Sequence, residues 1–99
     1  MKIAVIQIQS VLDFKKNMSK IQEFITEAKK QDISTIFLPE VFYSISDGTK
    51  PTPYLIEGEN EHFQNIANLA RKNQVYLLGG SVAVKENGKI VNRNLNFDP

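Results

Sequence analysis

Glu40 is the side chain in this sequence that is best placed to move a proton. It lies inside the segment TIFLPEVF, residues 35–42, where apolar residues precede and follow it. A carboxylate held among such neighbours is partly desolvated, which makes it a better proton acceptor and a candidate general base. The alternative is a solvated loop glutamate, or one that caps a neighbouring backbone group. Position and spacing alone favour the solvated alternative.

The other polar candidates are more simply explained by packing or by solvent. His62 is the only histidine, and no second ligand or Ser/Asp partner accompanies it at a useful spacing, so we predict a surface histidine. Tyr43 and Tyr54 bracket a long loop and could line a pocket, but packing is the simpler interpretation. The Gly-Gly-Ser segment at residues 79–81 lacks the lysine of a phosphate loop and the third glycine of a dinucleotide fingerprint, so we interpret it as strand geometry.

Three asparagines alternate with apolar residues near the end of the sequence. Asn92, Asn94 and Asn96 are predicted on one face of a strand. The apolar residues of the other face are Val91, Leu95 and Phe97. Three amides in a row are either solvated or part of an interior hydrogen-bond network. We expect solvent for two of the three.

A strand, a helix and a second strand are predicted ahead of Glu40. Residues 2–8, KIAVIQI, are apolar on both faces for most of their length, which is typical of a strand covered on both sides. From Phe14 apolar residues recur at steps of three and four, with Asp13 as the expected N-cap of an amphipathic helix. Residues 35–38 form the second strand, which a proline ends. This βαβ order makes the strands parallel and places Glu40 at their carboxyl end, where ligand sites lie.

The second half of the sequence repeats the alternation of helix and strand. Residues 43–58 contain scattered Gly and Pro and predict a long ordered loop. A helix is predicted over residues 60–72 and a strand over residues 75–84, whose two glycines permit a bend or the close approach of another backbone. Asn87-Gly88 is the preferred two-residue hairpin turn, and it leads into a last strand within residues 89–99.

Composition excludes several classes of function. The 99 residues are 41% hydrophobic and 23% charged, which suits one domain or part of one. A net charge of +1 gives no electrostatic footprint for nucleic acid or for an anionic membrane surface, so we expect neither as a partner. No signal sequence or membrane-spanning run is present, and we expect a cytoplasmic protein. There is no cysteine, so these residues hold no disulfide, thiolate metal site or thiol nucleophile.

Five segments, in their order and spacing, carry a family pattern. They are KIAVIQIQ, EAKKQD, TIFLPEVF, NIANLARKNQVYLLGGS and GKIVNRNLNFDP. Together they resemble the N-terminal portion of the nitrilase superfamily of carbon-nitrogen hydrolases. The branch that includes omega-amidase and deaminated-glutathione amidase is the most similar. The sharpest motif is LPE after the second strand, supported by GGS and by the Asn of VN ahead of DP.

The resemblance implies a fold and a reaction. The fold is an α/β structure, the N-terminal part of an αββα sandwich with a mixed sheet and helices on its outer face. The reaction is hydrolysis of a small amide or nitrile by a Glu-Lys-Cys triad, without metal or organic cofactor: the cysteine attacks, the glutamate takes its proton and the lysine stabilises the tetrahedral intermediate. Glu40 matches the family glutamate by position and flanking residues, which makes it the expected general base. Family members usually pair, so we expect a homo-oligomer.

The sequence also departs from the family pattern. Val91 stands where an aromatic residue commonly precedes the asparagine that aligns with Asn92, and Asn94 stands where a small residue is usual. The family lysine and cysteine fall beyond Pro99, so we expect residues 1–99 to be a partial, truncated domain that is inactive alone. Half of the second sheet layer would then be missing. The inner sheet face and an edge strand would be uncovered, and the chain would self-associate or be marginally folded.

Two other interpretations compete with the hydrolase. In the first, the chain is a non-catalytic α/β binding or assembly module in which Glu40 only contacts a ligand. In the second, it is an unrelated doubly wound domain of flavodoxin type with a glutamate at a strand end. The Asn87-Gly88 hairpin argues against the second, because consecutive antiparallel strands are unusual in such sheets.

Overall fold

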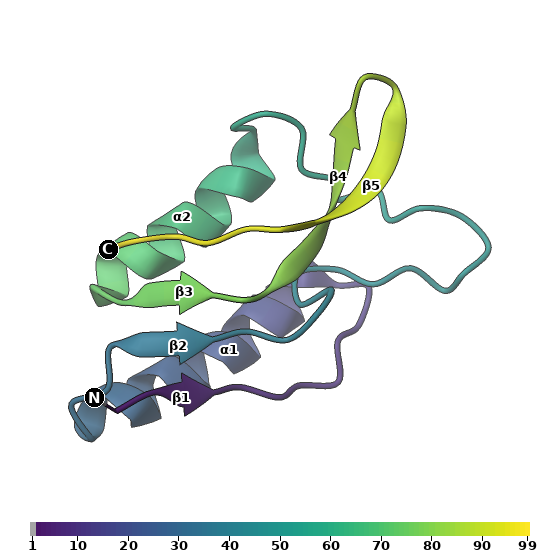
Figure 1. The fold of residues 1–99 in the computed structure, drawn as a ribbon. Helices are drawn as coiled ribbons and strands as arrows, with labels where there is room; N and C mark the ends of the chain where they lie inside the picture. The colour runs from purple at the N-terminus through teal and green to yellow at the C-terminus, as the bar shows by residue number, and fades with distance from the viewer. Residues whose placement is uncertain (1) are drawn as a thin grey trace.

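The computed structural model describes residues 2–99, which form two helices and five short strands (Figure 1). In chain order these are β1 (Ala4–Val5), α1 (Phe14–Lys30), β2 (Thr35–Phe37), α2 (Glu61–Asn73), β3 (Tyr76–Leu78), β4 (Ser81–Glu86) and β5 (Lys89–Asn94). The predicted βαβ unit is confirmed. So are the long loop before the second helix and the closing hairpin.

Three of the strands form a parallel sheet in the order β1-β2-β3. Ala4 is paired with Ile36, and Ile36 with Leu77. The segment after β5 continues the sheet beyond β3 in the antiparallel sense, because Leu77 and Phe97 exchange backbone hydrogen bonds of 2.9 and 2.8 Å. The sheet is therefore mixed, as predicted. Its first strand is shorter than the predicted range of residues 2–8.

Both helices begin where the sequence pattern places them. The Asp13 side chain accepts the Lys15 N–H at 2.9 Å and caps α1, and the Asn60 side chain accepts the Phe63 N–H at 3.1 Å and caps α2. These caps satisfy amide groups that the first turn of a helix leaves without a partner. Among the described residues, no helix is both long enough and apolar enough to cross a bilayer.

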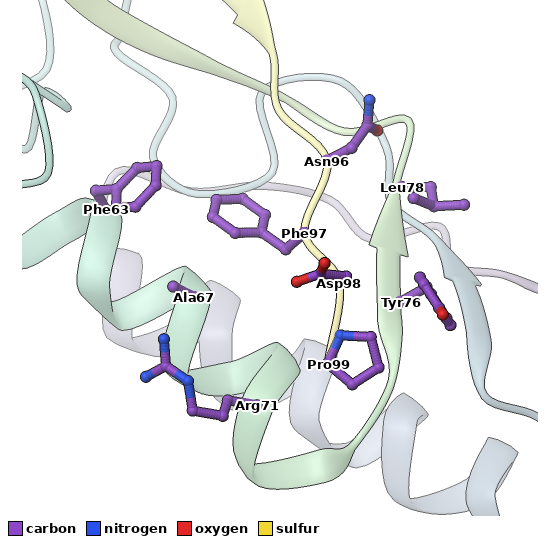
Figure 2. A pocket seen from close by; sticks show the side chains of 9 residues that line it. All are labelled: Phe63, Ala67, Arg71, Tyr76, Leu78, Asn96, Phe97, Asp98 and Pro99. Atoms are coloured by element: carbon purple, nitrogen blue, oxygen red, sulfur yellow. The ribbon is translucent and has the colours of Figure 1, made fainter.

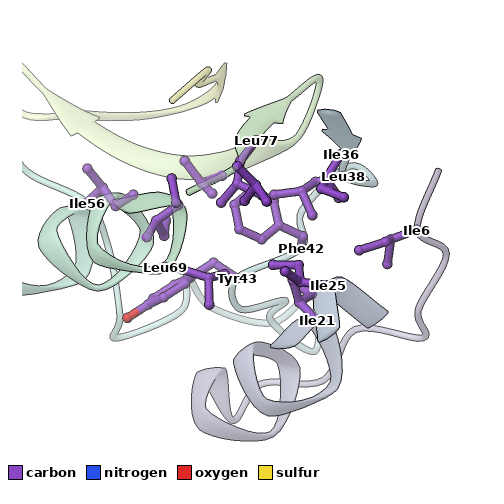
Figure 3. Packing of buried hydrophobic residues seen from close by; sticks show 14 of the residues in the cluster. Ile6, Ile21, Ile25, Ile36, Leu38, Phe42, Tyr43, Ile56, Leu69 and Leu77 are labelled. Carbon is purple, nitrogen blue, oxygen red and sulfur yellow. The ribbon is translucent and has the colours of Figure 1, made fainter. Parts of the chain in front are cut away.

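The two helices pack on the same face of the parallel sheet (Figures 1 and 3). Ile21 and Ile25 of α1 and Ile66 of α2 belong to one core with Ile36 and Leu77 of the sheet, and all five are completely buried. Full burial of such a side chain contributes about 1.5–3 kcal/mol. The apolar stripes of the helices and the inner residues of the strands therefore hold β2 in place, and with it the segment that carries Glu40.

The opposite face of the sheet carries apolar side chains that no described segment covers. Val5 is 69% exposed, Ile3 49% and Tyr76 46%. They alternate along the chain with the buried residues Ile6 and Leu77, as side chains of a strand do. The prediction that the first strand is covered on both sides is wrong for this chain. The predicted uncovered sheet face is present.

The predicted strand over residues 75–84 is divided into two, which corrects the sequence interpretation. Gly79 has a φ of +77°, so the chain turns there, and β3 and β4 belong to different sheets. Gly80 then passes so close to the core that an added Cβ would lie 2.6 Å from the ring of Phe42 and 2.8 Å from the Cβ of Leu38. The two glycines thus provide the predicted bend. The close approach is to side chains rather than to another backbone.

The β4–β5 hairpin confirms the turn prediction. Asn87 and Gly88 have φ values of 51° and 76°, as expected of a two-residue turn with positive φ at both positions. The hairpin is tied to the long loop, because the Ile56 N–H donates to the Ala83 carbonyl at 3.1 Å and the Ile56 carbonyl accepts the Lys85 N–H at 2.8 Å. Consecutive antiparallel strands do not suit a flavodoxin-type sheet, so that alternative is set aside.

Candidate active site

Glu40 follows β2 after Leu38 and Pro39, at the carboxyl end of the parallel sheet, as predicted. Strand pairing extends one residue beyond β2, because the Leu38 N–H donates to the Leu78 carbonyl at 2.8 Å. Pro39 follows and has no N–H to donate, which ends the ladder. Glu40 and Val41 form the turn that comes next. The carboxylate is thus presented at the edge of the sheet where ligands of α/β proteins bind.

The turn that carries Glu40 has an unusual backbone conformation. Val41 has a φ of 49°, in the left-handed region that β-branched residues rarely adopt. Two hydrogen bonds hold this part of the chain: the Val41 N–H donates to Ser81 Oγ at 2.9 Å, and the Phe42 N–H donates to the Ser81 carbonyl at 3.2 Å. Strained backbone of this kind clusters at functional sites, so the geometry marks the turn as a candidate site independently of the LPE motif.

Two of the three alternating asparagines, Asn94 and Asn96, bond the backbone of Gly79, at the bend between β3 and β4. Asn96 Oδ1 accepts the Gly79 N–H at 2.9 Å, and Asn94 Nδ2 donates to the Gly79 carbonyl at 3.1 Å. All three asparagines are exposed, and their predicted alternation with the more buried apolar residues is confirmed. The expectation that two of the three are solvated is confirmed, and the third is exposed as well; Asn94 and Asn96 in addition bond the backbone of Gly79. These bonds fix the bend that precedes Ser81.

Glu40 itself is exposed. The expectation that its apolar neighbours half-bury the carboxylate is therefore wrong for this chain. Leu38 and Phe42 are only 6% and 0% exposed because they turn into the core, and the turn between them carries Glu40 to the surface. A general base gains proton affinity from dry surroundings, and here they would have to come from outside the described residues.

A hollow of about 320 Å³ opens beside the turn, between the long loop and the hairpin. Val41 and Ile45 line it from the loop side, and Ile90 and Asn92 from the hairpin side. Its volume is at the lower end of the range for ligand pockets. Glu40 is not part of its lining, whereas the next residue in the chain, Val41, is.

A second hollow, of about 450 Å³, lies between α2 and the segment after β5 (Figure 2). The rings of Phe63 and Phe97 pack against each other in its lining, with centroids 5.3 Å apart and planes tilted by 55°. Its charged members are Arg71 and Asp98. None of its lining residues belongs to the Glu40 turn. This hollow is a seam between packed elements and does not add a group to the candidate site.

His62 is packed against aromatic rings, which corrects the prediction of a surface histidine. Its side chain is only 11% exposed, and its Nδ1 lies 2.6 Å from the Tyr43 hydroxyl. That hydroxyl also accepts a hydrogen bond from Asn65 Nδ2 at 2.9 Å, and the direction of its hydrogen bond with His62 depends on the histidine tautomer. Phe14 stacks on Tyr43 and meets Tyr54 edge-on, which confirms packing as the role of both tyrosines. Nothing in the spacing of these residues indicates the cluster, because they come from three separate segments, α1, the long loop and α2.

Comparison with known proteins decides the family. The family model for carbon-nitrogen hydrolases matches residues 2–99. The chain belongs to the carbon-nitrogen hydrolase family. Omega-amidase NIT2 of Mus musculus is 30% identical over 98 residues, which cover 99% of this chain and 36% of that protein. The structure of the C. elegans NitFhit protein matches with a TM-score of 0.77 and 27% identity, over 97% of this chain and 24% of that one.

A third comparison concerns the fold alone. An amidase from Nesterenkonia sp. matches with a TM-score of 0.79 at 18% identity, over 97% of this chain and 37% of that one. The mixed α/β arrangement of this carbon-nitrogen hydrolase chain is thus that of known nitrilase-superfamily structures, as the sequence resemblance implies. The chain spans about a third of the length of the curated relatives it matches.

Alkaline pH is expected to destabilise this carbon-nitrogen hydrolase chain through Tyr43. Burial raises the pKa of the Tyr43 hydroxyl from 10.0 to about 12. Below the pKa of tyrosine in the unfolded chain, the hydroxyl is protonated in both states and the buried Tyr43 contributes its full stabilisation. Between the two values the unfolded chain loses the proton while the folded chain keeps it, so the free energy of unfolding falls by about 1.4 kcal/mol per pH unit. Urea unfolding across this range should show the fall. In Tyr43→Phe the free energy of unfolding should fall less steeply with pH. An equally steep fall would contradict the role of Tyr43.

Proposed function

We propose that Glu40 is the general base of a cysteine-dependent hydrolase that cleaves a non-peptide C–N bond in a small amide or nitrile. One observation supports the proposal. In a chain of the carbon-nitrogen hydrolase family, Glu40 lies at the carboxyl end of β2, on a turn in which Val41 has a left-handed conformation and donates its N–H to Ser81 Oγ. Similarity to omega-amidase NIT2 supports an amide rather than a nitrile as the substrate class.

The proposed reaction on an amide proceeds through a thioester. Glu40 accepts the proton of the cysteine thiol as the sulfur–carbon bond forms, and a lysine of the triad stabilises the oxyanion. The C–N bond then breaks, and the proton passes from Glu40 to the leaving nitrogen. Water then attacks the thioester carbon while Glu40 takes a proton from the water. The carbon–sulfur bond breaks, the acid is released, and the proton passes from Glu40 to the leaving sulfur, which restores the thiol.

We propose further that residues 1–99 are the front part of a longer hydrolase and are inactive alone. They contain no cysteine, so a thiol nucleophile has to come from outside them. The relatives are about three times as long, which leaves room for a second sheet layer. Such a layer would cover the open face of the parallel sheet and exclude water from the turn at Glu40. A homo-oligomeric state and a cytoplasmic location also belong to this proposal, on sequence evidence alone.

Residues 1–99 expressed alone are expected to self-associate through the open sheet face, because Val5 and Tyr76 are 69% and 46% exposed there. Sedimentation velocity should show species larger than the monomer, and Val5→Lys should reduce them. Phe24→Lys is the matched control, since Phe24 is 41% exposed but lies on α1. A monodisperse monomer of the unaltered chain that melts cooperatively would contradict the expectation.

The alternative is a non-catalytic binding or assembly module, and the exposure of Glu40 together with the lack of cysteine favours it as the second candidate. The two functions differ in one measurement. If the full-length protein releases ammonia from small amides and Glu40→Gln abolishes the release, the hydrolase is supported. If it binds an amide without turnover and Glu40→Gln weakens only the binding, the module is supported.

A further inference from the structure

Ser81 connects the β4–β5 hairpin to the turn that carries Glu40 by hydrogen bonds. It is only 6% exposed, and it opens β4 directly after the bend at Gly79 and Gly80. Its side-chain oxygen accepts the Val41 N–H at 2.9 Å, and its carbonyl accepts the Phe42 N–H at 3.2 Å. One residue therefore binds two successive amides on the C-terminal side of Glu40.

These two hydrogen bonds differ in what they fix. The Phe42 bond uses a main-chain carbonyl, which every residue type at position 81 would supply. The Val41 bond depends on the serine hydroxyl. The Val41 N–H lies in the same rigid peptide plane as the Glu40 carbonyl, so holding it fixes ψ of Glu40 and the direction in which the Glu40 side chain leaves the backbone.

Val41 needs this help because of its own conformation. Its φ of 49° is costly for a β-branched side chain, which would relax toward negative φ if the hydroxyl were absent. Valine nevertheless suits the position, because its side chain lines the hollow between the loop and the hairpin. On the N-terminal side of Glu40, the hydrogen bond from the Leu38 N–H to the Leu78 carbonyl holds the chain independently of Ser81.

We propose that Ser81 is a positioning residue for the reaction. Its hydroxyl holds Val41 in the left-handed conformation and thereby sets the direction of the Glu40 carboxylate. This inference rests on the proposed function, because it needs Glu40 to be the base. Misplacing a reacting group by about 1 Å can lower a rate about 100-fold. Loss of the hydroxyl should therefore lower kcat and leave substrate binding largely intact.

The test is a double-mutant cycle in the full-length protein, with ammonia release from a small amide as the assay. Ser81→Ala is expected to lower kcat by about 10- to 100-fold, with KM changed by less than about 2-fold. Val41→Gly removes the need for the hydroxyl, because glycine adopts positive φ without strain. In the Val41→Gly background, Ser81→Ala is expected to lower kcat by less than about 3-fold.

Amide hydrogen exchange in the same proteins separates positioning from general loosening. Ser81→Ala is expected to accelerate exchange at Val41 and to leave exchange at Leu38 unchanged. Equal acceleration at both amides, or an equal loss of kcat in both backgrounds, would overturn the proposal. So would full activity of Ser81→Ala.

Glu40→Gln assayed alongside distinguishes this proposal from the function on which it rests. If Glu40→Gln is inactive and Ser81→Ala is fully active, the general base stands and the positioning role is overturned alone. If Glu40→Gln retains turnover, Glu40 is not the general base. Both the proposed function of Glu40 and the positioning role of Ser81 are then overturned.

Discussion

Replacing Glu40 by glutamine is expected to lower kcat of the proposed full-length hydrolase by about 100- to 10,000-fold, the range supplied by a positioned general base. The amide has nearly the shape of the carboxylate but does not accept the thiol proton. Glu40 is exposed and follows the core residue Leu38, so the substitution should leave the thermal unfolding temperature nearly unchanged. Ammonia release from a small amide, measured beside thermal unfolding, tests both parts.

The matched control is Glu57→Gln, which makes the same chemical change at an exposed glutamate of the long loop, away from the turn that carries Glu40. It is expected to keep wild-type kcat. Retained amidase activity in Glu40→Gln would remove Glu40 from the mechanism. Equal loss in both variants would show that loop charge, rather than a base at the end of β2, controls the rate.

Replacing Gly80 by alanine is expected to lower both stability and activity. The added Cβ would lie 2.6 Å from the ring of Phe42 and 2.8 Å from the Cβ of Leu38, and these are the core residues on either side of the Glu40 turn. Overpacking of this kind costs about 1–3 kcal/mol, measurable by urea unfolding. Because relief of the contact has to move Leu38 or Phe42, kcat should fall as well.

Gly48→Ala is the control for this substitution. A Cβ there would meet nothing within 4 Å, although the φ of +94° makes it strained. It is expected to lower stability slightly and to leave kcat unchanged. If Gly80→Ala proved as stable and as active as wild type, Gly80 would not set the spacing between the hairpin and the turn.

The elements that position the candidate site are those whose information is local in the sequence. Asp13 and Asn60 cap the helices because a short polar side chain reaches amides two or three residues ahead. Asn87-Gly88 makes the hairpin turn because both positions require positive φ. The carboxyl-end position of Glu40 follows from the same order of elements, so this part of the site was predictable.

The features that escaped prediction all depend on contacts between distant segments. Val41 gives no signal for a left-handed turn, since valine is a poor residue for one, and the partner that holds it is Ser81, 40 positions away. The contact between Tyr43 and His62 is equally invisible in the sequence. The apolar neighbours of Glu40 along the chain do not predict its exposure, because Leu38 and Phe42 turn inward and are not its neighbours in space.

The most direct test of Glu40 as the base for a thiol nucleophile is formation of the acyl-enzyme in a single turnover, followed by intact-protein mass spectrometry. Full-length wild-type protein mixed with a small amide is expected to gain the mass of the acyl group as ammonia is released, and then to lose it by hydrolysis. Glu40→Gln is expected to form no adduct on that timescale. An adduct that forms in Glu40→Gln at the wild-type rate would contradict the account.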